Sequence, residues 1–139
     1  MVLAMRIRKA KKADFLEILA LAKKYDLDYA DMKDDDFWVV EAEKKIVGIC
    51  GIKKHEDCQE LCSLGVDENY RNKGLARQLV LELLKKTKGE IYLATIMPRF
   101  FEKFGFKEAL RIPQSMIKNK DWCRGCPKEF CTVMARESK

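Results

Sequence analysis

One stretch decides the fold: Leu61-Cys-Ser-Leu-Gly-Val66, followed by Asp67-Glu-Asn-Tyr-Arg-Asn-Lys-Gly-Leu-Ala76. It reads as a strand, a charged turn and the start of a helix. Amide hydrogens at a helix N-terminus lack intrahelical partners, and the helix dipole favours negative charge there. Gly74 allows close approach to the backbone, while Arg71 and Lys73 add positive charge. The stretch predicts a pyrophosphate site, although an ordinary basic turn has similar residues.

The residues around this stretch alternate between strand and helix patterns. Upstream they predict a strand and then a helix, whose start is indicated by the capping-box spacing of Asp14 and Glu17. An acidic loop or short helix over 26–36 and a hairpin are predicted to follow. Downstream they predict a strand, a helix that starts at Pro98 and stops at Gly105, and two closing strands around an irregular segment, 111–129. The predicted strands are 5–8, 37–40, 46–52, 61–66, 91–95, 106–110 and 130–135, and the long helix starts at Leu75. This order predicts a mixed α/β sheet, not a regular doubly wound one.

Composition limits the protein class. The chain has 139 residues, 47% of them hydrophobic, which fits one globular domain over residues 1–139. Lys and Arg number 28 against 22 Asp and Glu, which suits an anionic partner such as nucleic acid, an acidic membrane or a phosphorylated cofactor, or else a solvated basic surface. No apolar run approaches the roughly 20 residues of a membrane span, and residues 1–5 lack the charged lead of a signal peptide. We therefore expect a cytoplasmic protein.

The segment from Val66 to Ala76 resembles the acetyl-CoA signature of the GNAT acetyltransferase superfamily, Arg/Gln-x-x-Gly-x-Gly/Ala. The likeness extends to the opening residues 7–14 and to Pro98-Arg-Phe-Phe-Glu-Lys-Phe-Gly-Phe106. The resemblance implies a mostly antiparallel central sheet flanked by helices, and acetyl-CoA as co-substrate. It also implies that the strand before the turn pairs with the pantetheine arm, whereas the turn amides hold the pyrophosphate. The residues so assigned are Leu64, Gly65, Val66, Arg71, Asn72, Lys73, Gly74, Leu75 and Ala76.

Acetyl transfer to an amine needs a base, positioning and hydrogen-bond donors. Glu60 lies six residues before Val66, and in histone-type GNAT enzymes a glutamate at that spacing is the general base. The alternative is a surface glutamate at a strand start. Many members use a tyrosine on the later helix as an acid toward the thiolate, but its place is taken by Phe101, which has no proton to donate. Water, or an unprotonated leaving thiolate, would replace it.

Six cysteines are present, three of them in Cys123-Arg-Gly-Cys126-Pro-Lys-Glu-Phe-Cys131. This spacing lets Cys123, Cys126 and Cys131 reach one zinc ion, but a structural site needs a fourth ligand. A redox or disulfide pair and plain thiols are the alternatives, and zinc is not favoured. Cys58, Cys62 or His55 could supply the fourth ligand if the fold brings one of them close, although a histidine in a polar loop is more often solvated.

The tail also resembles N-acetylglutamate synthase-like amino-acid acetyltransferases and their arsenic-resistance relatives, through residues 100–106, the stretch from Pro113, and Cys126-Pro127. This resemblance suggests a small acidic amino acid as acceptor, with Arg111 holding a carboxylate and Lys118 and Arg124 nearby; solvent-facing charges are the alternative. A protein amine as acceptor and a non-catalytic acyl-CoA-binding module stay open as other functions. We expect no nucleic-acid or membrane partner, and leave open whether the chain forms a homodimer.

Overall fold

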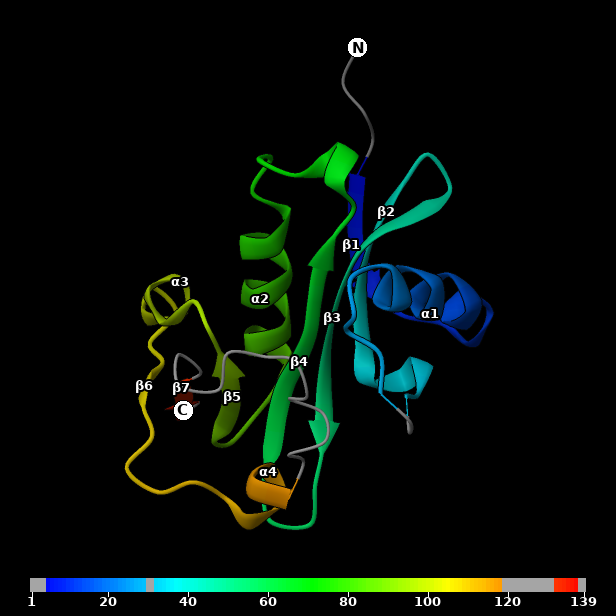
Figure 1. Cartoon of the computed structure of the whole chain (residues 1–139). Coiled ribbons are helices and arrows are strands. Elements are labelled where there is room, and N and C mark those ends of the chain that lie inside the picture. Colours follow the sequence, from blue (N-terminus) through cyan, green and yellow to red (C-terminus); the bar gives the residue numbers. More distant parts are fainter. Residues whose placement is uncertain (1–4, 30–31, 119–131, 138–139) are drawn as a thin grey trace. The chain divides into compact units, whose positions relative to one another are not determined.

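The computed structural model describes residues 5–29, 32–118 and 132–137, and Figure 1 traces its helices and strands. The strands are β1 (Met5–Lys9), β2 (Phe37–Ala42), β3 (Lys45–Lys54), β4 (Gln59–Val66), β5 (Ile91–Thr95), β6 (Lys107–Glu108) and β7 (Thr132–Arg136). The α-helices are α1 (Phe15–Lys24), α2 (Leu75–Lys86), α3 (Pro98–Glu102) and α4 (Gln114–Lys118). Short 3-10 turns form at η1 (Lys12–Asp14), η2 (Asp34–Asp36) and η3 (Glu68–Tyr70).

The strands form a seven-stranded sheet in the order β1-β2-β3-β4-β5-β7-β6. Strands β1 and β2, β2 and β3, β5 and β7, and β6 and β7 pair antiparallel. Strands β4 and β5 are parallel, with Glu60 opposite Tyr92. The predicted mixed, mostly antiparallel sheet flanked by helices is therefore confirmed.

The contacts divide the chain into two compact units, one made of Met1–Ile52 with Cys62–Thr87 and the other of Lys53–Leu61 with Lys88–Lys139. In the first unit, α1 and α2 lie on opposite faces of the sheet (Figure 1). The α1 face is built from Ile18 and Ala22 against alternate strand residues such as Val39 and Ile49. On the other face, Gly48 leaves room for Leu79 of α2 and for Val40. Because neighbouring strand residues point to opposite faces, the continuous apolar runs of β2 and β3 supply both cores.

The second unit has an aromatic core. Phe101, Phe104, Phe106, Leu93 and Met134 are all buried. The Phe101 ring meets Phe106 edge-on, with ring centroids 5.9 Å apart. Such edge-to-face pairs add to the stabilisation that area burial provides.

The start of α1 differs from the prediction. Asp14 does not cap α1; its carboxylate accepts the Lys11 amide hydrogen (2.7 Å) and two hydrogen bonds from the Arg8 guanidinium (2.7 and 3.0 Å). Glu17, the other half of the predicted box, accepts the amide hydrogen of Ile46 at 2.9 Å. Arg8 lies six residues before Asp14 in the preceding strand, and Ile46 lies 29 residues after Glu17. Capping-box spacing takes account of neither partner.

Smaller differences concern lengths. The strand predicted over 106–110 is only β6, the helix begun by Pro98 ends at Glu102 rather than at Gly105, and the segment predicted as irregular contains α4. Among the described residues of the acidic stretch, Asp34–Asp36 form a 3-10 turn, η2. The cysteine-rich segment lies outside the described residues, so its predicted chemistry stays a prediction.

The Arg8–Asp14 pair should stabilise the fold in a pH-dependent way. Hydrogen bonding from Arg8, together with the Lys11 amide, lowers the pKa of Asp14. The stabilisation is therefore present above the ordinary carboxyl pKa and is lost as pH falls through the lowered folded-state value. We expect Asp14→Asn to lower the free energy of unfolding by about 1–3 kcal/mol at pH 7. The loss should be smaller at pH 3, as measured by urea unfolding.

A matched control for this variant is Glu41→Gln, which weakens the hydrogen bond between Arg8 and its more exposed partner, Glu41. Glu41 lies 3.0 Å from Arg8 Nε, and its side chain is 33% exposed against 11% for Asp14. Solvent screens the more exposed pair, so its loss should cost less. Equal stability of Asp14→Asn and the wild type at pH 7 would contradict this account.

Candidate functional site

The turn after β4 is fixed by its own backbone. The Asp67 amide donates to the Val47 carbonyl (2.8 Å), and Asp67 Oδ1 accepts the Asn69 amide hydrogen (2.9 Å). Asn72 and Gly74 then adopt positive φ values of 65° and 76°, which turn the chain into α2. Residues 71–74 are exposed as a result.

The N-terminus of α2 is open. Gly74 is its N-cap residue and supplies no side chain, and a Cβ built on Gly74 meets nothing within 4 Å. Leu75, 3% exposed, anchors the helix in the core, so the first amides of the 12-residue helix are held in place beside this open space. An anion can approach the backbone here and gain both hydrogen bonds and the helix dipole. This geometry fits a phosphate group.

Arg71 contributes to the turn itself. Its Nε donates to the Val66 carbonyl at 2.9 Å, and its guanidinium lies 4.7 Å from the centroid of the Tyr25 ring. The Tyr25 hydroxyl in turn accepts the Glu68 amide hydrogen at 2.9 Å. Sequence reasoning missed Tyr25, because nothing local connects it with a turn more than 40 residues away.

The end of β4 packs under the segment that follows α1. Ser63 has a φ of 53° and donates its hydroxyl hydrogen to the Leu27 carbonyl at 2.7 Å. A Cβ on Gly65 would lie 2.6 Å from Leu27 Cδ1, so a larger residue here would require the end of the Leu27 side chain to shift. Leu64 and Gly65 remain half-buried, and Val66 is buried.

In the second unit, Glu60 pairs with His55. Glu60 Oε1 lies 2.8 Å from His55 Nε2, and each side chain is only 9% exposed. The loop between β3 and β4 is closed by the His55 amide, which donates to the Cys58 carbonyl at 2.8 Å. The alternative of a surface glutamate and the expectation of a solvated histidine are both wrong. The hairpin brings the two side chains together across its loop.

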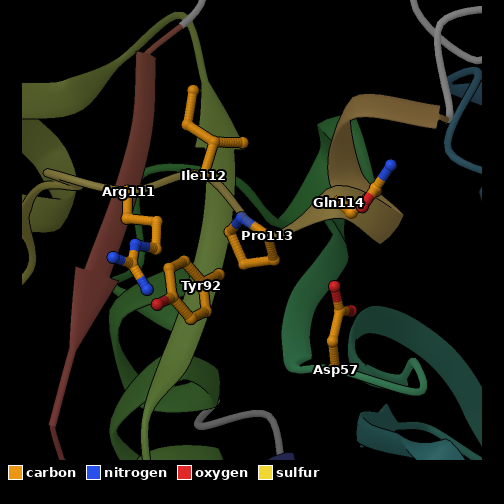
Figure 2. Close-up of a pocket in the computed structure, with 6 residues that line it drawn as sticks. All are labelled: Asp57, Tyr92, Arg111, Ile112, Pro113 and Gln114. Atoms are coloured by element: carbon orange, nitrogen blue, oxygen red, sulfur yellow. The ribbon is translucent and has the colours of Figure 1, made fainter.

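The second unit also contains a pocket of about 540 Å³. Figure 2 shows Arg111 directed toward Tyr92, with Pro113 beside them and Asp57 across the pocket. Its lining residues are Asp57, Tyr92, Arg111, Ile112, Pro113 and Gln114. Arg111, predicted from the sequence, is exposed here, whereas the side chain of Lys118 and all of Arg124 lie outside what the structure describes.

Hydrogen bonds from Tyr92 to Glu90 and from Ser115 to Asp57 influence the protonation of two residues that line this pocket. The Tyr92 hydroxyl donates to Glu90 at 2.7 Å, and that bond raises the pKa of Tyr92 to about 12. The Ser115 side chain and its amide, which lies 3.3 Å from Asp57, lower the pKa of the Asp57 carboxyl. At neutral pH the pocket therefore presents a cation, a phenol and a carboxylate.

Phe101 belongs to the core. It is 5% exposed and meets the Phe100 ring at 5.0 Å between centroids. It has no hydrogen to donate to a leaving thiolate.

Metal-binding groups are not found in the described residues: no three His, Cys, Asp or Glu side chains there are arranged to hold an ion. Burial raises the pKa of the Cys50 thiol well above its ordinary value and, together with Asp57, that of Cys58 to about 12. Both thiols are therefore protonated at neutral pH. Across the described ranges, no helix is long and apolar enough to cross a membrane.

The mixed sheet and the open strand–turn–helix define an α/β fold with an exposed helix N-terminus at Gly74. The family model described as "Acetyltransferase (GNAT) domain" matches residues 33–108, and the chain belongs to this family. A curated relative, an uncharacterized N-acetyltransferase of Chlorobaculum tepidum, is 33% identical over 102 residues, which cover 68% of this chain and 64% of the relative.

Solved structures share the fold at low sequence identity. N-acetylglutamate synthase from Neisseria gonorrhoeae, complexed with coenzyme A and N-acetyl-glutamate, superposes with a TM-score of 0.75 at 17% identity and covers 100% of this chain. Rv2747 from Mycobacterium tuberculosis, in complex with CoA, gives 0.71 at 19% identity, covering 95% of this chain and 98% of that protein. The chain spans only 36% of the Neisseria protein and 64% of the curated relative.

Proposed function

We propose that this chain is an acetyl-CoA-dependent N-acetyltransferase in which residues 1–139 act as one domain. The observation that carries the proposal is the open N-terminus of α2 beside Gly74, where a phosphate can meet unpaired amides. The backbone of residues 71–76 would bind the pyrophosphate of coenzyme A, and residues 64–66 of β4 would pair with its pantetheine arm. The names of the relative and of the CoA-bound structures support the same cofactor.

Acetyl-CoA supplies the thioester, and the chain must supply a base for the amine. We assign that role to Glu60, whose carboxylate takes a proton from the acceptor's ammonium group and leaves the free amine to attack the thioester. The low exposure of Glu60 suits this role, because a base in a dry site exchanges fewer protons with bulk water. Since Phe101 has no proton to give, the thiolate leaves unprotonated or takes a proton from water.

For the acceptor we propose the α-amine of a small acidic amino acid. The pocket at Arg111 has a volume typical of small-molecule sites, and an arginine can hold a carboxylate through two parallel hydrogen bonds. The ligand named in the Neisseria structure, N-acetyl-glutamate, is the product such a reaction would give from glutamate. A protein amine as acceptor, and acyl-CoA binding without transfer, are the competing functions.

The test compares glutamate, aspartate, lysine, spermidine and a histone-tail peptide as acceptors, with thiol release from acetyl-CoA as readout. We expect glutamate or aspartate to react fastest, and Arg111→Ala to raise the KM for glutamate about 10-fold or more, the scale of a lost charge-assisted pair. Arg99→Ala is the matched control, since Arg99 is an exposed arginine that does not line the pocket. A preference for spermidine or the peptide would reject the acidic acceptor. No thiol release with any amine would favour the non-catalytic module.

A further inference from the structure

We propose that His55 is a positioning residue that holds the carboxylate of Glu60 for proton transfer. The inference rests on the proposed function, in which Glu60 is the base. Its basis is the 2.8 Å contact between His55 Nε2 and Glu60 Oε1, with both side chains 9% exposed. Two groups that are this buried at hydrogen-bond distance restrain each other.

The histidine is itself fixed by the hairpin. Its amide donates to the Cys58 carbonyl at 2.8 Å. The loop between β3 and β4 therefore places the imidazole beside the start of β4, where Glu60 lies. Elsewhere in the described part of the chain, the Glu60 carboxylate makes no second hydrogen bond. Without His55 the glutamate side chain would be free to rotate about its three torsions, and the reacting oxygen would lose its fixed position.

The hydrogen bond from His55 also gives the two carboxylate oxygens of Glu60 different roles. Nε2 donates its hydrogen to Oε1, which leaves Oε2 for the incoming ammonium group. In the transfer, an N–H bond of the ammonium breaks, an O–H bond forms on Oε2, and the nitrogen lone pair becomes available for attack. An imidazole can hold the carboxylate without the permanent positive charge of an arginine, a charge that would oppose protonation of the carboxylate.

The groups around the pair leave the pH profile readable. Cys58 lies in the same loop, and Tyr92 lies opposite Glu60 on β5. The pKa of each is raised to about 12, so neither titrates near neutral pH. The carboxylates of Asp57 and Glu90 also act on Cys58, and Arg111 acts on Tyr92.

Three variants test the proposal: His55→Ala, His55→Gln, whose amide can still donate to Oε1, and Lys54→Ala as an exposed neighbour on β3. We expect His55→Ala to lower kcat about 10- to 100-fold, the range seen when a supporting hydrogen bond is lost, and to leave the Kd for acetyl-CoA unchanged. His55→Gln should recover most of kcat, and Lys54→Ala should match the wild type. The pH profile of kcat/KM should keep its shape in His55→Gln.

A double variant separates positioning from an independent role. If His55 acts through Glu60, adding His55→Ala to Glu60→Gln should lower kcat little further. If the two residues act independently, the fold-losses in kcat of the two single variants should multiply in the double variant. Wild-type kcat in His55→Ala, or multiplied losses in the double variant, would overturn the proposal. Full activity of Glu60→Gln alone would instead overturn the assignment of the base.

A readout that needs no activity is the tautomer. Nitrogen-15 NMR of the imidazole should show a hydrogen on Nε2 in the wild type at pH 8, with the Nε2 resonance shifted in Glu60→Gln and unchanged in Lys54→Ala. A hydrogen on Nδ1 alone would contradict the donor role of Nε2, whatever the transfer assays show.

Discussion

Gly74→Glu is expected to weaken acetyl-CoA binding about 100-fold or more, the scale of about 3 kcal/mol at 1.4 kcal/mol per tenfold. The Cβ of residue 74 would stand in the open space beside the α2 amides, and the carboxylate would occupy the place of a phosphate with the same sign of charge. Isothermal calorimetry on the folded variant measures the change. Circular dichroism should show the helix content of the wild type.

Two matched variants separate the contributions to this loss. Gly74→Gln has the bulk of the glutamate without its charge, and Gly74→Ala has only the strain of a Cβ at a φ of 76°. The strain costs about 1–2 kcal/mol of stability. Affinity should fall in the order Ala, Gln, Glu. Wild-type affinity in Gly74→Glu would mean that coenzyme A binds elsewhere.

Glu60→Gln is expected to lower kcat about 100-fold or more at neutral pH, the usual effect of removing a general base. Glutamine keeps the shape of the side chain and an oxygen that accepts from His55, so the fold should be retained. The deficit should shrink as pH rises, because more of the acceptor is already a free amine. The measurement is kcat by thiol release between pH 6.5 and 9.5.

Glu56→Gln is the control for this variant, since Glu56 is an exposed glutamate in the same hairpin loop. It should match the wild type at every pH. A Glu60→Gln enzyme with the wild-type rate would mean that water or a backbone carbonyl accepts the proton.

The fold was predictable to the extent that it depends on local patterns. The helical spacing after Gly74, the continuous apolar runs of β2 and β3, and Pro98 at a helix start each specify an element by neighbouring residues, and each element is present. The predicted cap of α1 failed because Asp14 bonds to Arg8 of β1 and Glu17 to the amide of Ile46 on β3. Contacts across a sheet depend on register, which one sequence does not reveal.

The candidate site shows the same division. The turn at Gly74 was predictable because a single segment builds it. His55 was taken for a solvated residue, although its position at one end of a short loop, with Glu60 just beyond the other end, was a usable signal. Tyr25 under Arg71 gave no signal of this kind. The pocket around Arg111 joins residues from three separate segments, and nothing near Arg111 in the sequence indicates that Asp57 and Tyr92 lie beside it.

The most direct test of the central claim is to map the coenzyme A site on the unmodified chain. A nitrogen-15-labelled protein is titrated with acetyl-CoA, and the backbone amide resonances are followed by NMR. The account predicts that the largest shifts fall on residues 72–76 at the start of α2 and on residues 64–66 of β4. Binding with the largest shifts elsewhere, or no binding at millimolar acetyl-CoA, would contradict it.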